Sequence, residues 1–350
     1  MSFDVTVIGL GVMGSAAAWQ LSRRGLRVLG VEQFTPAHDR GSSHGLTRVI
    51  RKAYYEHPAY VPLVLRSYEL WGELEREAGV ELFRKTGAFM IGRPESALVR
   101  GSLESARLHG LNHRLLGAAE LRARFPSMSF RDREVALEEF DAGVLLVEDA
   151  VLAFQEAARR RGAELRFGVE GRPGSSAKTV IAAGPWLPKL VPRLPLKVER
   201  QVLFWFEPRT PDPVPLFMWD RDGRLLYSIP DVRDHGVKVA FHHAGEITTP
   251  ESVRREVSQA EIDDVKAWME TTVPSLNGAL KKVATCLYTN TPDEHFVIGP
   301  APGSPDVVVV SPCSGHGFKF APVVGEIVAD LVGEGRTRHP IDRFRPDRLM

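Results

Sequence analysis

The sequence predicts an α/β protein in which a doubly wound domain is interleaved with an α+β domain built on a mostly antiparallel sheet. Three observations favour this class. The chain opens with a strand, a glycine-rich turn and a helix; strand patterns dominate from about 196 to 298; and the C-terminal part returns to a strand, a glycine-rich turn and a helix. A chain of 350 residues is longer than one core usually needs, so two domains are expected.

Charge and composition exclude several classes of function. Lysine and arginine total 45 against 44 aspartate and glutamate residues, so the formal net charge of +1 gives no global field that would recruit nucleic acid or an anionic membrane. Two cysteines cannot form a disulfide framework, and no apolar run approaches the roughly 20 residues that span a bilayer. The chain starts directly with a strand pattern and shows no signal-peptide core. We therefore expect a cytoplasmic protein.

The first 34 residues predict a βαβ unit. Gly9, Gly11 and Gly14 form the pattern G-x-G-x-x-G between a buried strand at 5–8 and a helix rich in small residues. Such glycines permit a tight turn, bring a pyrophosphate close to the helix N-terminus, and let helix and strand pack closely. Glu32 ends the second strand 18 residues after Gly14, where an acid can accept a hydrogen bond from a ribose hydroxyl. Together these features predict a Rossmann-type dinucleotide site; the alternative is a glycine turn without a ligand.

Helices and short strands alternate in the next part of the chain. Residues 38–60 read as a polar loop, and an amphipathic helix follows it. The apolar face of this helix is expected to carry Val61, Val64, Leu65, Tyr68 and Trp71. Short strands at 87–92 and 143–147 alternate with helices at 95–110 and 117–125. This alternation indicates a different unit inserted into the first domain.

The remaining elements complete the two expected domains. A helix and a strand return at 148–168, and a buried strand then runs into Gly184, a second turn where backbone could approach a cofactor. Strand patterns from 196 to 298 are interrupted by one helix at 259–273. We assign 1–80, 146–195 and 299–350 to the doubly wound domain, and 81–145 and 196–298 to a substrate domain.

Two glycine-rich turns at opposite ends of the chain favour FAD over NAD. FAD is long enough to need both: its adenosine and pyrophosphate would lie along the N-terminal turn, and its ring near the segment SGHGFKF at 314–320. There the positive end of a helix could stabilise negative charge on the reduced ring. The sequence therefore predicts a flavoprotein, with no metal site.

The chain resembles the monomeric sarcosine oxidase family of flavoproteins, which includes N-methyl-amino-acid oxidases and N-methyltryptophan oxidases and is related to D-amino-acid oxidase. The resemblance covers nearly the whole length. It is carried by the segments GLGVMG, GSSHGLTRVIR, YVPLVLRSYELW, AAGPW, QVLFWF, CLYTNTPDEHFVIG and SGHGFKF. It implies oxidation of a secondary-amine amino acid to an imine, with O₂ reduced to H₂O₂, by a protein that acts as a monomer.

The resemblance gives Cys286 a covalent role. In the family, the cysteine of the C-x-Y-T segment carries FAD through a thioether at the 8α-methyl group, and Cys286 is the matching residue. Such a tether would fix the ring and raise its oxidising power. The other interpretation is that Cys286 is a small buried hydrophobic residue. Cys313 is expected only to pack.

The resemblance also implies a substrate site and an oxygen site. Arg51 and Lys319 match the pair that binds the substrate carboxylate, and Arg48 matches an arginine near the ring. Lys238 matches the lysine that activates oxygen in the family. A cation suits that role, because it lowers the barrier to forming superoxide. The remaining implied site residues are His242 and Tyr227 as active-site side chains, Tyr54 and Gly315 at the substrate, and Ser42, Thr289, Gly315, His316 and Gly317 at the cofactor.

Two departures leave the substrate open. The segment 52–60, a lid in the family, lacks the Gly-Glu-Gly pattern of the best-known sarcosine oxidases, and the segment 168–178 is shorter than in relatives. The rival functions are a flavin dehydrogenase, a D-amino-acid or glycine oxidase, and a flavoprotein subunit that passes electrons to a partner. An NAD-dependent dehydrogenase is disfavoured by the second glycine turn.

Overall fold

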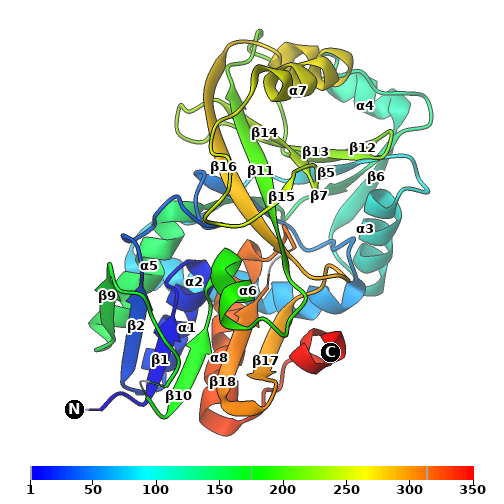
Figure 1. Cartoon of the computed structure of the whole chain (residues 1–350). Helices are drawn as coiled ribbons and strands as arrows, with labels where there is room; N and C mark the ends of the chain where they lie inside the picture. The colour runs from blue at the N-terminus through cyan, green and yellow to red at the C-terminus, as the bar shows by residue number, and fades with distance from the viewer. Residues whose placement is uncertain (1, 175, 313) are drawn as a thin grey trace.

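The computed structural model describes residues 2–174, 176–312 and 314–350, and its strands form three sheets (Figure 1). A six-stranded sheet lies in the lower half of the view, with both chain ends. A nine-stranded sheet lies in the upper half, between the labels α3 and α7. The class predicted from the sequence, α/β with a mostly antiparallel second sheet, is confirmed.

The six-stranded sheet has the order β17-β18-β10-β1-β2-β9. All neighbouring strands are parallel except β17 and β18. The helices α1, α5 and α8 pack together beside it, and β1 and β2 are buried along their whole length, as expected for a covered parallel sheet. The bounds are β1 (Val5–Ile8), α1 (Val12–Arg23), β2 (Val28–Glu32), α5 (Val147–Arg160), β9 (Glu164–Phe167), β10 (Lys178–Ile181), α6 (Leu187–Leu190), β17 (Val297–Ala301), β18 (Ser304–Ser311) and α8 (Ala321–Glu334).

The nine-stranded sheet has the order β15-β11-β14-β13-β12-β5-β7-β6, with β16 paired to β11. Every pair in it is antiparallel except β12 with β5. The long strands β11 and β16 carry the sheet down toward the six-stranded sheet (Figure 1). The bounds are β5 (Ala88–Gly92), α3 (Ala97–Leu108), β6 (His113–Gly117), α4 (Ala118–Arg124), β7 (Val135–Glu139), β11 (Lys197–Phe206), β12 (Phe217–Arg221), β13 (Arg224–Ile229), β14 (Val237–His242), β15 (Ile247–Thr248), α7 (Gln259–Thr272) and β16 (Leu280–Asn290).

A small third sheet corrects one prediction. Its strands are β3 (Thr47–Ile50), β8 (Gly143–Leu146) and β4 (Phe83–Lys85). The loop predicted at 38–60 therefore contains a strand, and Arg48 lies on this strand. The sequence Thr-Arg-Val-Ile is rich in β-branched residues, which favour a strand when a partner such as β8 is present.

The amphipathic helix predicted after that loop is α2 (Val61–Ala78), but one residue predicted on its buried face is exposed. Trp71 and Val64 are buried as expected, but Leu65 is 36% exposed. The buried stripe instead continues through Leu63, Leu70 and Leu74, which follow the helical period of 3.6 residues.

The division into two domains stays a prediction, although β17 begins two residues before the boundary placed at 299. In the shortened segment at 168–178, the described residues between β9 and β10 form turns and no strand.

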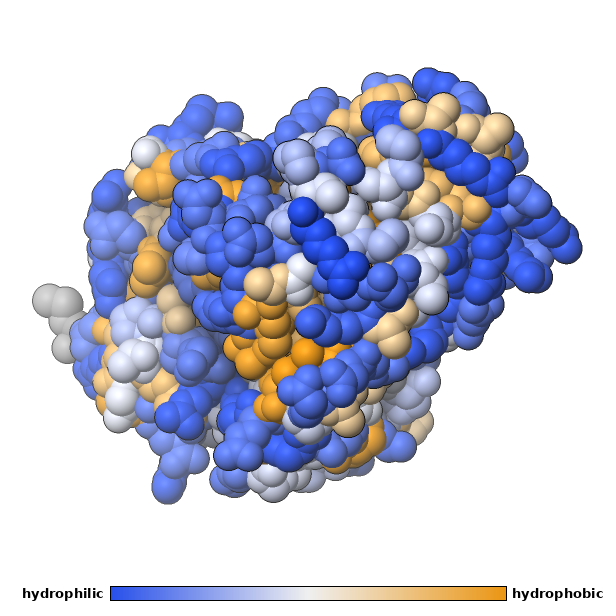
Figure 2. Space-filling model, turned by 90° about the horizontal axis from the view of Figure 1, so that it is seen from above, coloured by the Kyte–Doolittle hydropathy of each residue, from blue (hydrophilic) through white to orange (hydrophobic). Residues whose placement is uncertain are grey.

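The outer surface is mostly hydrophilic in the view from above (Figure 2). Hydrophobic residues reach this face in a cluster near its middle and in smaller groups. Among the described residues, no helix is long and apolar enough to cross a bilayer.

Candidate active site

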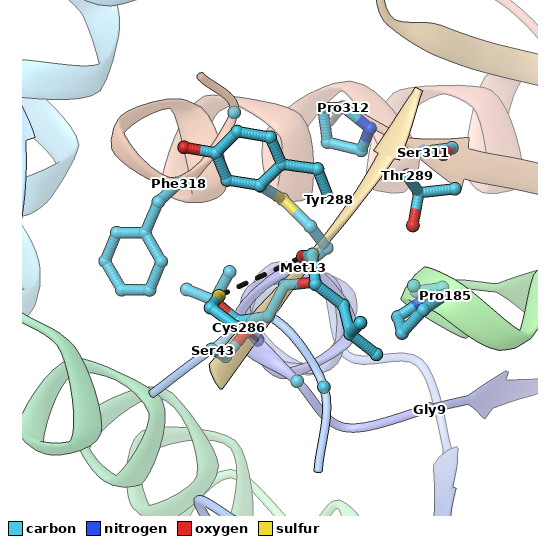
Figure 3. A pocket seen from close by; sticks show the side chains of 18 of the residues that line it. Gly9, Met13, Ser43, Pro185, Cys286, Tyr288, Thr289, Ser311, Pro312 and Phe318 are labelled. Atoms are coloured by element: carbon cyan, nitrogen blue, oxygen red, sulfur yellow. Dashed lines mark hydrogen bonds between the residues drawn. The ribbon is translucent and has the colours of Figure 1, made fainter. Parts of the chain in front are cut away.

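A large cavity, called the main cavity below, runs from the glycine turn after β1 to β16 and the segment after β18 (Figure 3). It brings together most of the residues singled out in the sequence. Those that line it are Gly9, Gly11, Glu32, Ser42, Arg48, Arg51, Gly184, Tyr227, His242, Cys286, Thr289, Gly315, His316, Gly317 and Lys319. Gly14, Tyr54 and Lys238 do not line it.

Two positions in and after the glycine turn, Gly9 and Gly14, have no room for a side chain. Gly9 has φ +88°, and a Cβ there would lie 2.7 Å from the Ala182 carbonyl oxygen. A Cβ on Gly14 would lie 1.8 Å from the Gly9 carbonyl oxygen. Gly14 therefore allows α1 to pack on β1, whereas Gly9 and Gly11 form the wall of the cavity.

The N-terminus of α1 is left open toward the cavity. Its N-cap is Gly11, which has no side chain to accept from the first N–H groups. The Val12 N–H instead donates to Ser43 Oγ over 3.0 Å, and Ser43 lines the cavity. Ser43 was missed in the sequence, where the serine pair at 42–43 in a polar loop was the available signal.

Glu32 lies where the predicted ribose-binding acid belongs, and its carboxylate already has partners. It accepts from the N–H groups of Leu10 at 2.8 Å and Phe34 at 3.1 Å, and His38 Nε2 lies 3.4 Å away. Burial alone would raise the pKa of Glu32, but these donors outweigh it and hold the pKa below its ordinary value. Glu32 is therefore an anion fixed at the edge of the cavity.

Cys286 lies on β16 and is 1% exposed, with its sulfur beside a cation. Arg48 Nη2 lies 3.4 Å from Cys286 Sγ. Burial alone would raise the pKa of the thiol, but Arg48 and His44 outweigh it and lower the pKa to about 6. A thiolate is the nucleophilic form of cysteine, so this setting favours reactivity as well as packing. Cys313, expected only to pack, lies outside the described residues.

Arg51 is buried and is already paired. Its Nη2 donates to both carboxylate oxygens of Glu56 at 2.8 and 2.9 Å, and its Nη1 donates to the Ala53 carbonyl at 2.7 Å. Burial raises and Arg51 lowers the pKa of Glu56, with a net shift below its ordinary value. Glu56 lines the main cavity and was not predicted as a site residue. An acid within the recognised lid segment was the signal that could have found it.

Lys319 provides a second cation at the same end of the cavity. Its Nζ donates to the His316 carbonyl at 2.8 Å and lies 5.2 Å from the centre of the Tyr54 ring. Burial and the charge of Arg51 lower the pKa of Lys319 to about 7. An anionic ligand close to this amine would favour its charged form.

Tyr54 and His316 contact each other at the same end of the cavity as Lys319. The His316 Nε2 lies 3.0 Å from the Glu294 carbonyl, and because a carbonyl can only accept, that nitrogen carries the proton. Nδ1 therefore accepts from the Tyr54 hydroxyl at 2.6 Å. Burial lowers the pKa of His316 to about 4, so the ring is neutral. Tyr54, predicted at the substrate, is fully buried beneath the cavity wall.

A polar group lines the cavity: Tyr227 on β13, His242 on β14 and Tyr288 on β16. His242 Nδ1 lies 3.2 Å from the Tyr288 hydroxyl. Burial, together with His243, lowers the pKa of His242 well below its ordinary value. Gly315, at φ +79°, faces this group, because a Cβ there would lie 2.5 Å from the Tyr288 ring and 2.6 Å from His242. Tyr288 belongs to the C-x-Y-T segment but was not assigned a role from the sequence.

Lys238 lies on β14 behind the main cavity. Its Nζ donates to the carbonyls of Gly45 and Thr47, both at 2.9 Å. Burial and Arg48 lower the pKa of Lys238 well below its ordinary value. Instead of the main cavity, it lines a second cavity with Trp205 and Glu148.

The residues present fit a flavin dinucleotide. Thr289 Oγ1 is buried and lacks a hydrogen-bond partner among the described residues, although Thr289 lines the cavity. A flavin carbonyl would satisfy this hydroxyl, since buried polar groups are rarely left unpaired. The glycine turn, the open end of α1 and the Cys286 sulfur lie along the same cavity. By contrast, the described residues contain no cluster of three or more His, Cys, Asp or Glu side chains suited to a metal ion.

Comparisons with known proteins agree with this arrangement. The family model described as FAD dependent oxidoreductase matches residues 4–331. Monomeric sarcosine oxidase from Streptomyces avermitilis is 48% identical, over 99% of this chain and 98% of its own. N-methyl-L-tryptophan oxidase from Salmonella dublin is 34% identical over the whole of both chains. The solved structure of NikD, an unusual amino acid oxidase essential for nikkomycin biosynthesis, is 25% identical with a TM-score of 0.85, covering 99% of this chain and 97% of its own.

Proposed function

The chain belongs to the FAD dependent oxidoreductase family, and we propose that it oxidises a secondary-amine amino acid, such as sarcosine or another N-methyl amino acid, to an imine while O₂ is reduced to H₂O₂. One observation carries the proposal: Arg51 and Lys319, two buried cations, line the same cavity as the glycine turn and Cys286. The names of the relatives, monomeric sarcosine oxidase and N-methyl-L-tryptophan oxidase, support the substrate class.

The main cavity would hold FAD along its length. Gly9, Gly11 and the N-terminus of α1 would accommodate the pyrophosphate, and Glu32 would accept from the ribose. When bound, FAD supplies the acceptor for the two electrons of the amine and passes them to O₂. Cys286, which lines this cavity, would hold the cofactor covalently. Arg48 Nη2 at 3.4 Å and the lowered pKa of the thiol both favour the nucleophilic thiolate.

The substrate carboxylate would bind to Arg51 and Lys319. Charge-assisted hydrogen bonds from two cations fix both the position and the orientation of a carboxylate. Glu56 occupies the Arg51 guanidinium in this structure, so the incoming carboxylate has to displace it or share the guanidinium with it. If the substrate displaces Glu56, its binding free energy includes the cost of separating the Arg51–Glu56 ion pair.

The same cations favour a neutral amine in the substrate. A positive charge near an amine lowers its pKa, and Arg51, Lys319 and Arg48 all line the cavity. A neutral amine can lose its hydride without a protein base. His242, whose pKa burial keeps low, is also neutral and can exchange hydrogen bonds with the amine and Tyr288.

Lys238 is assigned to the reduction of O₂. A cation lowers the free energy of the superoxide that the first electron transfer creates. Burial opposes the ammonium form of Lys238, and the two carbonyls at 2.9 Å favour that form by accepting hydrogen bonds from it. The nearby Arg48 adds a second positive charge on the side of the main cavity.

The experiment is an amine screen on the purified yellow protein. N-methyl amino acids, cyclic amino acids, glycine, D-amino acids and simple amines are each supplied with O₂, and H₂O₂ release is measured. We expect peroxide with secondary-amine amino acids above all. Peroxide only with D-amino acids or glycine would contradict the substrate class. Reduction of an artificial acceptor without peroxide would indicate a dehydrogenase, and activity only after adding a partner protein would indicate an electron-transfer subunit.

Two further expectations accompany the function. The word "monomeric" in the name of a relative supports a monomer, which size-exclusion chromatography with light scattering checks directly. The cytoplasmic location stays a prediction from the sequence.

A further inference from the structure

The second cavity reaches Lys238 from a different side of the protein than the main cavity. It measures about 180 Å³ and lies between β3, the start of α5 and the loop that joins β13 to β14. Among the residues that line it are Lys238, Trp205, Val147 and Thr47, none of which lines the main cavity. The space is large enough for several small molecules, since a cavity of about 10–15 Å³ already holds one water.

The lining of this cavity changes from exposed to buried along its length. Asp231, Arg233 and His235, on the loop between β13 and β14, are exposed and form the outer rim. Trp205 and Lys238 are each 1% exposed and Val147 is fully buried. The cavity therefore extends from an exposed rim toward the buried Lys238 side chain.

Lys238 lies in the wall between the two cavities. A Cβ on Gly45 would lie 3.6 Å from both Lys238 Nζ and Arg48 Nη1, and Arg48 lines the main cavity. Lys238 and Arg48 are therefore close neighbours beside Gly45. A small molecule that reaches Lys238 through the second cavity is thus next to the region where the flavin ring is expected.

The chemistry of the walls fits a small, weakly polar molecule. Leu46, Leu146, Val147 and Trp205 give the inner part an apolar surface. The hydroxyl of Thr47 is buried and has no hydrogen-bond partner among the described residues, which leaves it free for a water or a peroxide. The rim is narrowed by an ion pair between Arg233 and Asp149. The charged side chains of the lining already have partners: Glu148 accepts from the N–H groups of Gly45 and Leu46, and Lys238 donates to two carbonyls. An amino acid zwitterion would therefore lose its hydration in such a passage without finding an unpaired charge to bind.

We propose that the second cavity is the passage through which O₂ reaches Lys238 and H₂O₂ leaves, while the amine uses the main cavity. This inference rests on the proposed oxidase function. Separate entrances would let O₂ reach the site while the amine or its product still occupies the main cavity.

The test places bulk in the passage at two depths. Val147→Phe fills the buried part, and Val232→Trp fills the outer part on the loop, where the fold tolerates change more readily. Val283→Trp is the matched control: it makes the same change on β16, at a residue that is 37% exposed and lines neither cavity. Near-ultraviolet circular dichroism and the visible spectrum establish that each variant holds its cofactor in a folded protein.

The kinetic measurement starts from holoenzyme reduced with dithionite, so no amine is needed. On mixing with O₂, we expect reoxidation about tenfold slower in Val147→Phe, less slowed in Val232→Trp, and unchanged in Val283→Trp. Reduction by the amine under anaerobic conditions should be unaffected in all three. Because the reductant is chemical, a failed amine screen would contradict the proposed substrate and leave this test intact.

A second measurement is independent of activity. Xenon binds apolar cavities that also admit O₂, so crystals of the holoenzyme under xenon pressure should show it beside Trp205 and Val147, and Val147→Phe should remove it. Reoxidation at the unmodified rate in both folded plug variants would overturn the proposal, as would an equal slowing of both half-reactions or the absence of xenon from the unmodified protein.

Discussion

The two ends of the main cavity are built in different ways. At the end near β1, the cavity wall is mostly backbone: Gly9 with its positive φ and the start of α1, whose N-cap is Gly11. Glu32 is fixed there by main-chain N–H groups. At the other end, the wall is made of side chains, among them the cations Arg48, Arg51 and Lys319, and Cys286. The first end suits binding of a dinucleotide, and the charges of the second end can alter the reactivity of the bound cofactor. Each prediction below alters one end and asks whether the other keeps its function.

The largest effect is expected from Cys286→Ser, which should remove covalent attachment completely while the glycine end still binds FAD. Acid precipitation should leave the flavin with the unmodified protein and release it into the supernatant from the variant. Thr289→Val, three residues along β16, is the control and should keep its flavin in the pellet. Flavin in the supernatant from the unmodified protein would rule out the tether.

Lys238→Met should slow reoxidation by O₂ by about 10²–10³-fold, the usual range for removing one electrostatic contact to a developing charge. Reduction by the amine should change little, because Lys238 does not line the main cavity. Since burial lowers the pKa of Lys238, reoxidation of the unmodified protein should slow as the pH rises through that pKa, where the ammonium loses its proton. The variant should lack this pH dependence. Stopped-flow absorbance measures both half-reactions, and equal slowing of both would remove Lys238 from the oxygen site.

The same contrast explains how much the sequence predicted. The glycine end was visible in residues 5–32, because the strand, the turn and the helix lie next to one another and each is set by local spacing. The comparisons confirm the prediction of an FAD-dependent protein and the fold class. The side-chain end is assembled from residues 48, 51, 286 and 319, and no local pattern shows that they meet. Those positions were reached through the resemblance to a known family.

The errors also follow from what sequence patterns omit. Glu56 was passed over because an acid in a loop reads as solvated, whereas the fold places it on Arg51. The strand β3 was read as loop because its partner, β8, lies almost a hundred residues further on. For Lys238, whose assignment to the oxygen site stays a prediction, the sequence could not tell which of two cavities the side chain meets, because alternation along a strand gives only the face.

Arg51→Ala should raise the KM for carboxylated amines by roughly 10–100-fold, because a hydrogen bond to a charged group contributes about 1.5–3 kcal/mol. Amines without a carboxylate should be spared. The single variant also leaves Glu56 buried without its partner, so Arg51→Ala combined with Glu56→Gln separates the two effects. Arg133→Ala, at an exposed arginine, is the control. An unchanged KM in the double variant would exclude Arg51 from carboxylate binding.

Gly9→Ala addresses the other end of the cavity. The new Cβ would meet the Ala182 carbonyl at 2.7 Å and the residue would keep a positive φ, a strain of about 1–3 kcal/mol. In a Cys286→Ser background, where FAD can exchange, we expect the affinity for FAD to fall about tenfold by fluorescence titration. Gly25→Ala has a similar positive φ with nothing within 4 Å of the new Cβ, so it controls for backbone strain alone. Equal loss in both variants would show that the turn at Gly9 has no special part in binding.

The smallest effect is expected from Glu56→Gln, which tests whether the charged end is held closed by its own ion pair. Both carboxylate oxygens of Glu56 accept from Arg51 Nη2, at 2.8 and 2.9 Å, so a substrate carboxylate competes with Glu56 for this nitrogen. A neutral amide competes less well, and we expect the KM for carboxylated amines to fall about threefold, which corresponds to a fraction of a kcal/mol. Glu69→Gln removes the same charge from the exposed face of α2 and should leave the KM unchanged. A higher KM in Glu56→Gln would instead mean that the carboxylate contacts the substrate amine, and Glu56 would then belong to the binding site and not to its closure.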